Sequence, residues 1–120
     1  MGNDKLYTLK EDSFRFYREE ELFNLIKKYL DDHPRKVTIT ELSEYFHYNR
    51  DYLSRVFLNN IHLTIREYNT TVYLKEAYRL LKETSLSVSE ITRRTGFASR
   101  SQFYQAIRDH YGCTPAEVRK

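Results

Sequence analysis

Glycine, proline and cysteine are scarce in this chain of 120 residues, and each shortage excludes a class of protein. Three glycines and two prolines are too few for the many tight turns of an all-β protein. The glycines, Gly2, Gly96 and Gly112, are also too scattered to form a phosphate-binding loop. The single cysteine, Cys113, cannot form an internal disulfide, which is typical of a protein of the reducing cytoplasm.

Long apolar runs are absent too. No uninterrupted run exceeds three residues, whereas a membrane-spanning helix needs about 20, and the N-terminus carries no basic-then-apolar signal segment. We therefore expect no membrane contact and a cytoplasmic location. With 40% hydrophobic and 15% aromatic residues, the chain is nevertheless apolar enough to fold as one ordinary domain or two very small ones.

The charges are unevenly distributed along the chain. The net charge of +3 is only mildly basic, but acidic residues crowd the stretch 11–32, whereas residues 93–108 contain four arginines and no carboxylate. Such segregation can steer a polyanion onto one face of a protein. An ordinary solvated surface accounts for the same pattern, so the motifs must decide between the two interpretations.

Apolar residues recur at helical spacing, which predicts an all-α fold of about seven helices. Residues 1–16 show no period and are interpreted as an N-terminal tail or linker remnant. The expected helices span about residues 19–32, 39–46, 50–59, 64–84, 88–94 and 100–111, with a last short helix from 115. The second is expected to turn Leu42, Tyr45 and Phe46 inward.

The helix expected at 64–84 changes its apolar side halfway along. Ile65, Tyr68 and Val72 cluster on one side, whereas Leu74, Ala77, Tyr78 and Leu81 cluster roughly opposite. A helix of a single core keeps one stripe. This pattern therefore predicts a long bridging helix that joins a first subdomain at 17–63 to a second at 85–120.

The two predicted subdomains repeat one another. Thr38-x-x-Glu41 matches Ser87-x-x-Glu90 at an offset of 49, and both have the form of a helix-capping box. Beyond the turn the offset becomes 50. The further matched pairs are Asn49 with Ser99, Leu53 with Phe103, Phe57 with Ile107, His62 with Gly112 and Thr64 with Thr114. Each unit has the plan of a helix-turn-helix, although a tandem helical-hairpin scaffold for protein contacts would show the same pattern.

Several runs in these repeats carry a resemblance to a known family. They are YLSRVF at 52–57, AYRLL at 77–81, SEI at 89–91, GF at 96–97, SQFY at 101–104 and GCTPAEVR at 112–119. From about residue 38 to 119 the chain resembles the DNA-binding domain of AraC-type bacterial transcription regulators. The resemblance implies two recognition helices in successive major-groove segments of a double-stranded DNA operator, with RNA polymerase as an expected partner. Leu58 stands where the family usually places a basic residue, which favours the rival interpretation of a helical protein-interaction module without DNA affinity.

The resemblance also bears on assembly. Regulators of this type commonly carry a sensing or dimerising domain ahead of the DNA-binding domain. We expect this chain to bind as a monomer to a directional site of about 15–20 base pairs, and a longer form to dimerise through such a domain. We expect no cofactor.

Candidate base-contacting residues lie on the free faces of the two predicted recognition helices. They are Arg50, Asp51, Ser54 and Arg55 on the first, and Arg100, Ser101, Gln102, Tyr104 and Gln105 on the second. Arginine suits guanine, glutamine suits adenine, aspartate suits the cytosine amine, and serine suits any of these. The family pattern implies base contacts at all of these except Arg50, Arg100 and Tyr104. A solvated helix face is the alternative for each.

Candidate phosphate contacts lie at the starts of the first helices of the two units and on scattered arginines. They are Thr38, Thr40, Ser87, Ser89, Arg93, Arg94, Arg108 and Arg119. Helix capping is the alternative for the hydroxyl residues, and a role in solubility is the alternative for the arginines. His110 and Cys113 are too few for a metal site, so we expect neither metal nor enzymatic activity. An RNA-binding role is a further alternative, but the sequence suggests no strands with an aromatic platform on which RNA bases could stack.

Overall fold

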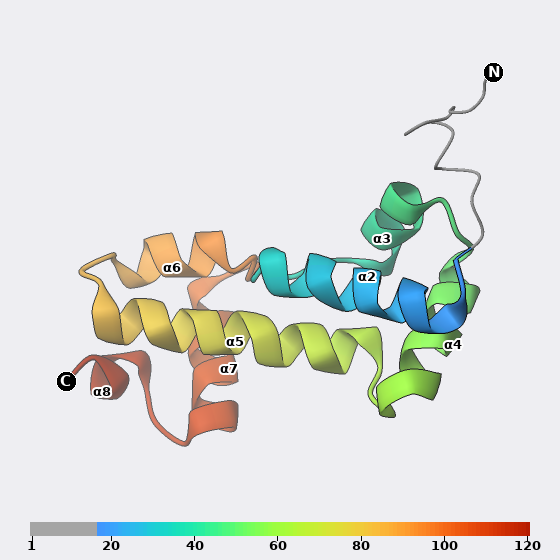
Figure 1. Cartoon of the computed structure of the whole chain (residues 1–120). Coiled ribbons are helices and arrows are strands. Elements are labelled where there is room, and N and C mark those ends of the chain that lie inside the picture. The colour runs from blue at the N-terminus through green and yellow to red at the C-terminus, as the bar shows by residue number, and fades with distance from the viewer. Residues whose placement is uncertain (1–16) are drawn as a thin grey trace. The chain divides into compact units, whose positions relative to one another are not determined.

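A computed structural model describes residues 17–120, and the interpretation of residues 1–16 as a tail lies outside this part of the chain. Within residues 17–120 the regular secondary structure is entirely helical (Figure 1). The seven helices are α2 (Glu19–Asp32), α3 (Ile39–Phe46), α4 (Arg50–Ile61), α5 (Ile65–Glu83), α6 (Val88–Arg94), α7 (Arg100–Tyr111) and α8 (Pro115–Arg119). The predicted all-α fold is confirmed.

The helix starts follow from local capping. The side-chain oxygens of Thr38, Asn49, Ser87 and Ser99 accept hydrogen bonds from backbone N–H groups in the first turns of α3, α4, α6 and α7. Thr114 and Glu117 form a complete capping box at α8, with Pro115 in its first turn. These caps explain why the sequence located the starts of these helices correctly.

The two helices that were predicted to face DNA, α4 and α7, end in the same way. His62 and Gly112 adopt left-handed conformations, with φ of 59° and 75°, and their N–H groups donate to Leu58 O and Arg108 O, both at 2.8 Å. α4 therefore runs two residues beyond its expected end at Asn59. The matched positions of the repeat share a backbone conformation, although one is histidine and the other glycine.

The chain divides into two compact units. The first contains the described residues up to Tyr29 together with Val37–Ile65, and the second contains Leu30–Lys36 together with Arg66–Lys120. Nearly all of α5 therefore belongs to the second unit by its contacts. The sequence-based division into 17–63, a bridging helix at 64–84 and 85–120 stays a prediction.

The first unit is built around aliphatic and phenylalanine side chains. The fully buried ones are Leu22, Ile26, Leu42, Leu53, Val56 and Phe57, and the ring of Phe23 lies 5.0 Å from that of Phe57. The expectation that Tyr45 points inward is wrong, because its side chain is 61% exposed. Its ring instead covers Tyr29 at 4.6 Å, and the Tyr29 hydroxyl donates to Glu41 at 2.6 Å.

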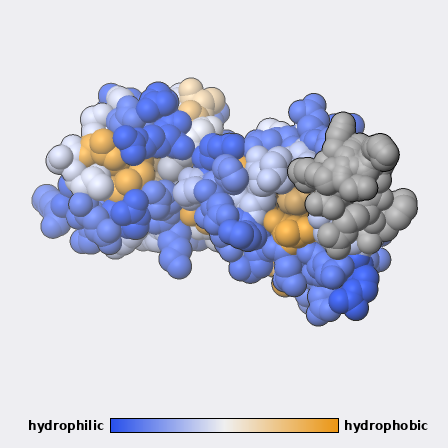
Figure 2. Space-filling view, turned by 45° about the horizontal axis from the view of Figure 1, so that its top comes forward, coloured by the Kyte–Doolittle hydropathy of each residue, from blue (hydrophilic) through white to orange (hydrophobic). Residues whose placement is uncertain are grey.

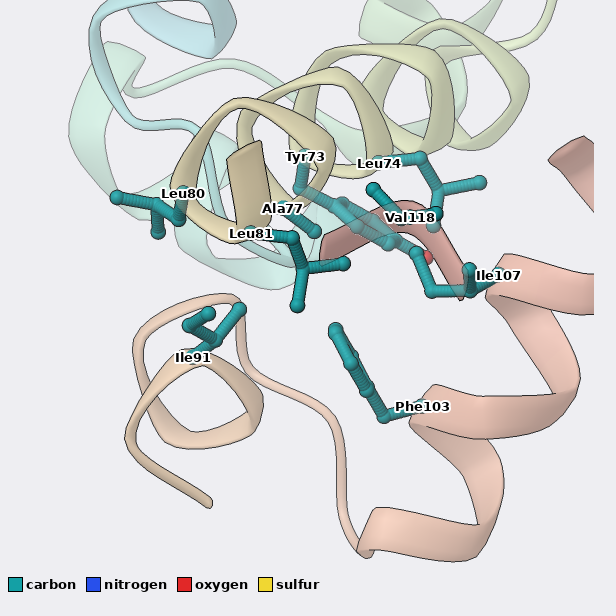
Figure 3. Close-up of a cluster of buried hydrophobic side chains, with 9 residues drawn as sticks. All are labelled: Tyr73, Leu74, Ala77, Leu80, Leu81, Ile91, Phe103, Ile107 and Val118. Carbon is teal, nitrogen blue, oxygen red and sulfur yellow. The ribbon is translucent and has the colours of Figure 1, made fainter. Parts of the chain in front are cut away.

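The second unit has a core to which four helices contribute. α5 supplies Tyr73, Leu74, Ala77, Leu80 and Leu81, and these converge on Ile91 of α6, Phe103 and Ile107 of α7, and Val118 of α8 (Figure 3). The helical pattern identified Leu74, Ala77 and Leu81 but missed Tyr73 and Leu80. Tyr73 is buried because its ring meets the edge of Phe97 at 5.4 Å, a contact across the fold.

The visible surface is dominated by hydrophilic residues, with only small hydrophobic areas between them (Figure 2). Among residues 17–120, no helix combines the length and hydropathy needed to cross a bilayer.

Candidate nucleic-acid interface

The first helix-turn-helix unit consists of α3, a short turn and α4. The Ser43 hydroxyl donates to Tyr48 O at 2.6 Å across the turn, and Asn49 then caps α4. Leu53, Val56 and Phe57 are buried. The four side chains expected to face DNA are all exposed, namely Arg50, Asp51, Ser54 and Arg55.

Both arginines on α4 have neighbours that limit their freedom. The Arg50 guanidinium donates to the Thr40 hydroxyl at 3.4 Å, which brings a predicted base contact beside a predicted phosphate contact. The Arg55 guanidinium lies 5.5 Å from the centre of the Tyr52 ring, at the distance of a cation–π contact. Tyr52 is half-buried, and its ring supports the Arg55 guanidinium from the same helix.

The second unit consists of α6, the turn at residues 95–99, and α7. Thr95 is fully buried, and its hydroxyl donates to Ile91 O at 2.7 Å. Gly96 takes a φ of 82°, a conformation in which most side chains are strained. Ser99 caps α7, and Phe103 and Ile107 are fully buried.

The exposed face of α7 carries the expected polar side chains. Arg100, Ser101, Gln102 and Gln105 are exposed, and Tyr104 is half-buried. The Gln105 amide nitrogen donates to Asp109 at 2.8 Å, so part of its hydrogen-bonding capacity is occupied. Within the described residues the Gln102 side chain makes no hydrogen bond or ion pair, which leaves its amide available to a base edge.

The predicted capping box at Ser87 and Glu90 is only half correct. Ser87 accepts from Glu90 N at 3.0 Å, but the Glu90 carboxylate accepts from Arg93 and Arg94 instead of returning to the backbone of Ser87. These guanidinium hydrogen bonds, Arg93's first and then Arg94's, hold the pKa of Glu90 at about 2, well below its ordinary 4.5. The stabilisation is present above the ordinary pKa and is lost as the pH falls from about 4.5 towards 2.

The other candidate phosphate contacts divide into engaged and free groups. The Thr38 hydroxyl caps α3 by accepting from Glu41 N, whereas Ser89 and Arg108 are exposed. Arg119 donates to the carbonyls of Leu80, Leu81 and Thr84 at the end of α5, at 3.1–3.4 Å. We therefore assign Arg119 to the capping of α5, where a cation also complements the helix dipole.

A contact that the sequence did not reveal lies at the second turn. Lys36, 59 positions before Thr95, donates its backbone N–H to Thr95 O at 3.1 Å, and its ammonium lies 5.2 Å from the Phe97 ring centre. No periodicity or capping motif connects residues so far apart. The only sequence signal was Pro34, which lies just beyond the end of α2.

Comparison with known proteins places this geometry in a family. Residues 42–120 match the family described as a helix-turn-helix domain. The chain is 28% identical over 98 residues to the Msm operon regulatory protein of Streptococcus mutans, covering 81% of this chain and 35% of that protein. The chain spans about a third of the length of the curated relatives that it matches first.

Solved structures share the fold. The C-terminal domain of AraT, a response regulator from Geobacillus stearothermophilus, superimposes with a TM-score of 0.77 at 23% identity, over 86% of this chain and 87% of that one. A transcriptional regulator with an AraC-type DNA-binding domain from Chromobacterium violaceum gives 0.72 at 24% identity, over 83% and 90%.

The fold and the two capped units define a tandem helix-turn-helix domain. The chain belongs to the helix-turn-helix family of AraC-type DNA-binding domains, whose members are transcription regulators.

Proposed function

We propose that this chain reads a directional sequence of double-stranded DNA as a monomer, with α4 and α7 as its recognition helices. The observation that carries the proposal is the matched build of these helices: each follows a capped turn, buries one apolar stripe and exposes base-reading side chains on the remaining face. Because the exposed residues of the two helices differ, one chain would read two different blocks of sequence. A symmetric dimer would instead require an inverted repeat.

The chemistry of the exposed side chains supports this role. Arg55 and Arg100 can donate paired hydrogen bonds to guanine, and Gln102 can pair with adenine. Asp51 can accept from the cytosine amine, and Ser54 and Ser101 suit several bases. Arg50 and Gln105 complete the proposed base-contacting set, although both already hold a neighbour within the protein.

The attraction to phosphate is proposed to come mainly from the second unit. Its residues include 12 lysines and arginines against eight carboxylates, whereas the described part of the first unit has five against six. We propose Arg93, Arg94 and Arg108 as phosphate contacts of the second unit, together with Ser87 and Ser89 at the start of α6. Thr38 and Thr40, at the start of α3, are the proposed phosphate contacts of the first unit. Long-range attraction of this kind raises affinity for every sequence and also steers association.

Selection of bound sites from random duplexes tests the proposed function directly. We expect enrichment of a non-palindromic motif of about 15–20 base pairs with two separate blocks. A palindromic motif would contradict monomeric reading. Absence of any enriched motif would favour the protein-interaction module, for which Leu58, 44% exposed on α4, is the best surface feature.

Substitutions should separate base readers from phosphate contacts. Arg55→Ala and Gln102→Ala are each expected to weaken binding to the selected site by about 1–3 kcal/mol and to relax preference at one base position. Arg94→Ala should weaken binding to all sequences equally. Competition binding against single-base variants of the site measures both effects, and an unchanged preference in Arg55→Ala would reassign this residue to phosphate contact.

The ion pairs of Glu90 predict a variant that binds more tightly. Glu90→Gln removes the carboxylate that holds Arg93 and Arg94, so both guanidinium groups become available to phosphate. We expect about 2- to 5-fold tighter binding to all duplexes, the scale of exposed ion pairs, with a steeper salt dependence. Glu76→Gln is the matched control, because Glu76 pairs with Arg79 at 2.9 Å on α5 and carries the same charge. Equal gains in both variants would reduce the effect to net charge.

We further propose that the protein acts in the bacterial cytoplasm and contacts RNA polymerase, without enzymatic activity or a cofactor. The support is membership of a family of transcription regulators, which includes regulators of operons. Co-purification of RNA polymerase on a promoter fragment, with and without the chain, tests the partner.

A further inference from the structure

The last three residues of α2 and the first four of the connector to α3 belong to the second unit, although they precede the whole first helix-turn-helix in sequence. We call residues 31–36 the strap. It is tied to α5 at two points: the Tyr68 hydroxyl donates to Asp31 at 2.5 Å, and the Asn69 amide donates to Arg35 O at 2.9 Å. Asn69 is only 4% exposed, so its amide is held in a buried position.

The far end of the strap lies against the turn that precedes α7. Lys36 contributes its backbone N–H to Thr95 O and its ammonium to the face of the Phe97 ring. A Cβ atom at Gly96 would lie 3.2 Å from both Cβ and N of Lys36, which is closer than ordinary van der Waals contact. The turn thus fits the strap with no space for a side chain between them.

The turn at 95–97 also contacts α7, the second proposed recognition helix. The rings of Phe97 and Phe103 meet edge to face at 5.4 Å, and Phe103 is one of the two fully buried residues of α7. Well-packed aromatic contacts of this kind transmit displacement, because protein interiors have little free volume. A shift of the strap would therefore displace the first turn of α7, where Arg100, Ser101 and Gln102 are exposed.

We propose that Lys36 is a positioning residue for the second recognition helix. The strap fixes the turn at 95–97 and thereby the orientation of α7 towards the bases that it reads. This inference rests on the proposed function. Lys36 would contribute to sequence reading without touching a base. It therefore differs from Arg55 and Gln102, which act through direct contact.

The first test compares Lys36→Ala with Lys36→Arg and with Lys75→Ala in the full chain. Lys75 is an exposed lysine of α5 in the same unit, so its loss removes the same charge without touching the turn. Lys36→Ala should reduce discrimination between bases by about 2- to 5-fold, the scale of one cation–π contact. This loss should fall in the block of the DNA site whose reading Gln102→Ala relaxes. The other block should be read normally, and Lys36→Arg should retain wild-type reading. Identical behaviour of Lys36→Ala and Lys75→Ala would overturn the proposal.

The second test uses the two glycines with positive φ. Gly96→Ala and Gly112→Ala impose similar backbone strain, at φ of 82° and 75°, but nothing lies within 4 Å of a Cβ at Gly112. Gly96→Ala should therefore weaken reading of the α7 block about 5- to 30-fold more than Gly112→Ala, because it alone displaces the strap. Equal losses would contradict the inference.

A measurement without DNA separates this inference from the proposed function. In the free chain, amide hydrogen exchange at residues 95–103 should be faster in Lys36→Ala than in Lys75→Ala and the wild type, whereas exchange in α4 stays unchanged. Failure of the wild type to select any DNA sequence would refute the proposed function. Unchanged exchange in Lys36→Ala would refute the strap.

Discussion

Raising the salt concentration from about 50 to 200 mM should weaken duplex binding by about 10³–10⁵-fold, if the chain makes roughly 6–10 phosphate contacts. Each neutralised phosphate releases condensed counterions, and that release is less favourable in concentrated salt. The exposed cations of the second unit are the proposed source of most of these contacts. Titrations at several salt concentrations give the number of contacts from the slope of log affinity against log salt.

The slope of log affinity against log salt also distinguishes a DNA-binding domain from a protein-interaction module. Arg108→Ala should flatten it by about one contact, because Arg108 is exposed on α7 and has no carboxylate partner among the described ion pairs. Ser54→Ala, which removes no charge, should leave the slope unchanged. Binding that ignores salt, or no binding even at low salt, would favour the protein-interaction module.

Replacing the anchor of α7 should have the largest effect on folding. Phe103→Ala is expected to lower the free energy of unfolding by about 3–5 kcal/mol, since it removes a fully buried ring from the core shown in Figure 3. A domain with about 5–15 kcal/mol of stability loses a large share of it. Urea denaturation followed by circular dichroism measures the change.

Two variants calibrate this result. Gln102→Ala, one residue away on the exposed face of α7, should change the free energy of unfolding by no more than about 0.5 kcal/mol. Leu53→Ala, at the matched position of the first unit, should cost about 2–5 kcal/mol. A loss below about 1 kcal/mol in Phe103→Ala would show that the core does not depend on this ring.

The sequence alone determined the helices and their repeat. Thr38, Asn49, Ser87 and Ser99 mark helix starts because each cap bond closes within two or three residues. Information of this kind is local and can be read from spacing. The inward residues Leu53, Phe57, Phe103 and Ile107 were also predicted, since one apolar stripe suffices to orient a helix.

The exposed face of each recognition helix followed from the same logic. Once the apolar stripe is assigned, the remaining positions of a helix have only solvent or a ligand to face. Eight of the nine candidate base-contacting residues are indeed exposed, and the ninth, Tyr104, is half-buried. Their contact with DNA stays a prediction, because exposure is required for reading a base and does not establish it.

Only the tertiary structure decided how polar and aromatic groups are shared. Glu90 had a plausible backbone partner at Ser87, but two arginines on the next turn compete for its carboxylate and win through charge. Arg119 resembled a surface cation until the end of α5 was placed beside it. Tyr45 fitted an apolar stripe, yet its ring caps Tyr29 at the surface because a tyrosine needs only one face covered.

The strap shows most clearly where sequence patterns end. Lys36 meets Thr95 across 59 residues, through one backbone hydrogen bond and one ring contact that leave no periodic trace. Gly96 could be recognised as a turn residue from its type alone. That its missing side chain also makes room for Lys36 depends on two distant backbones meeting, and only folding brings them together.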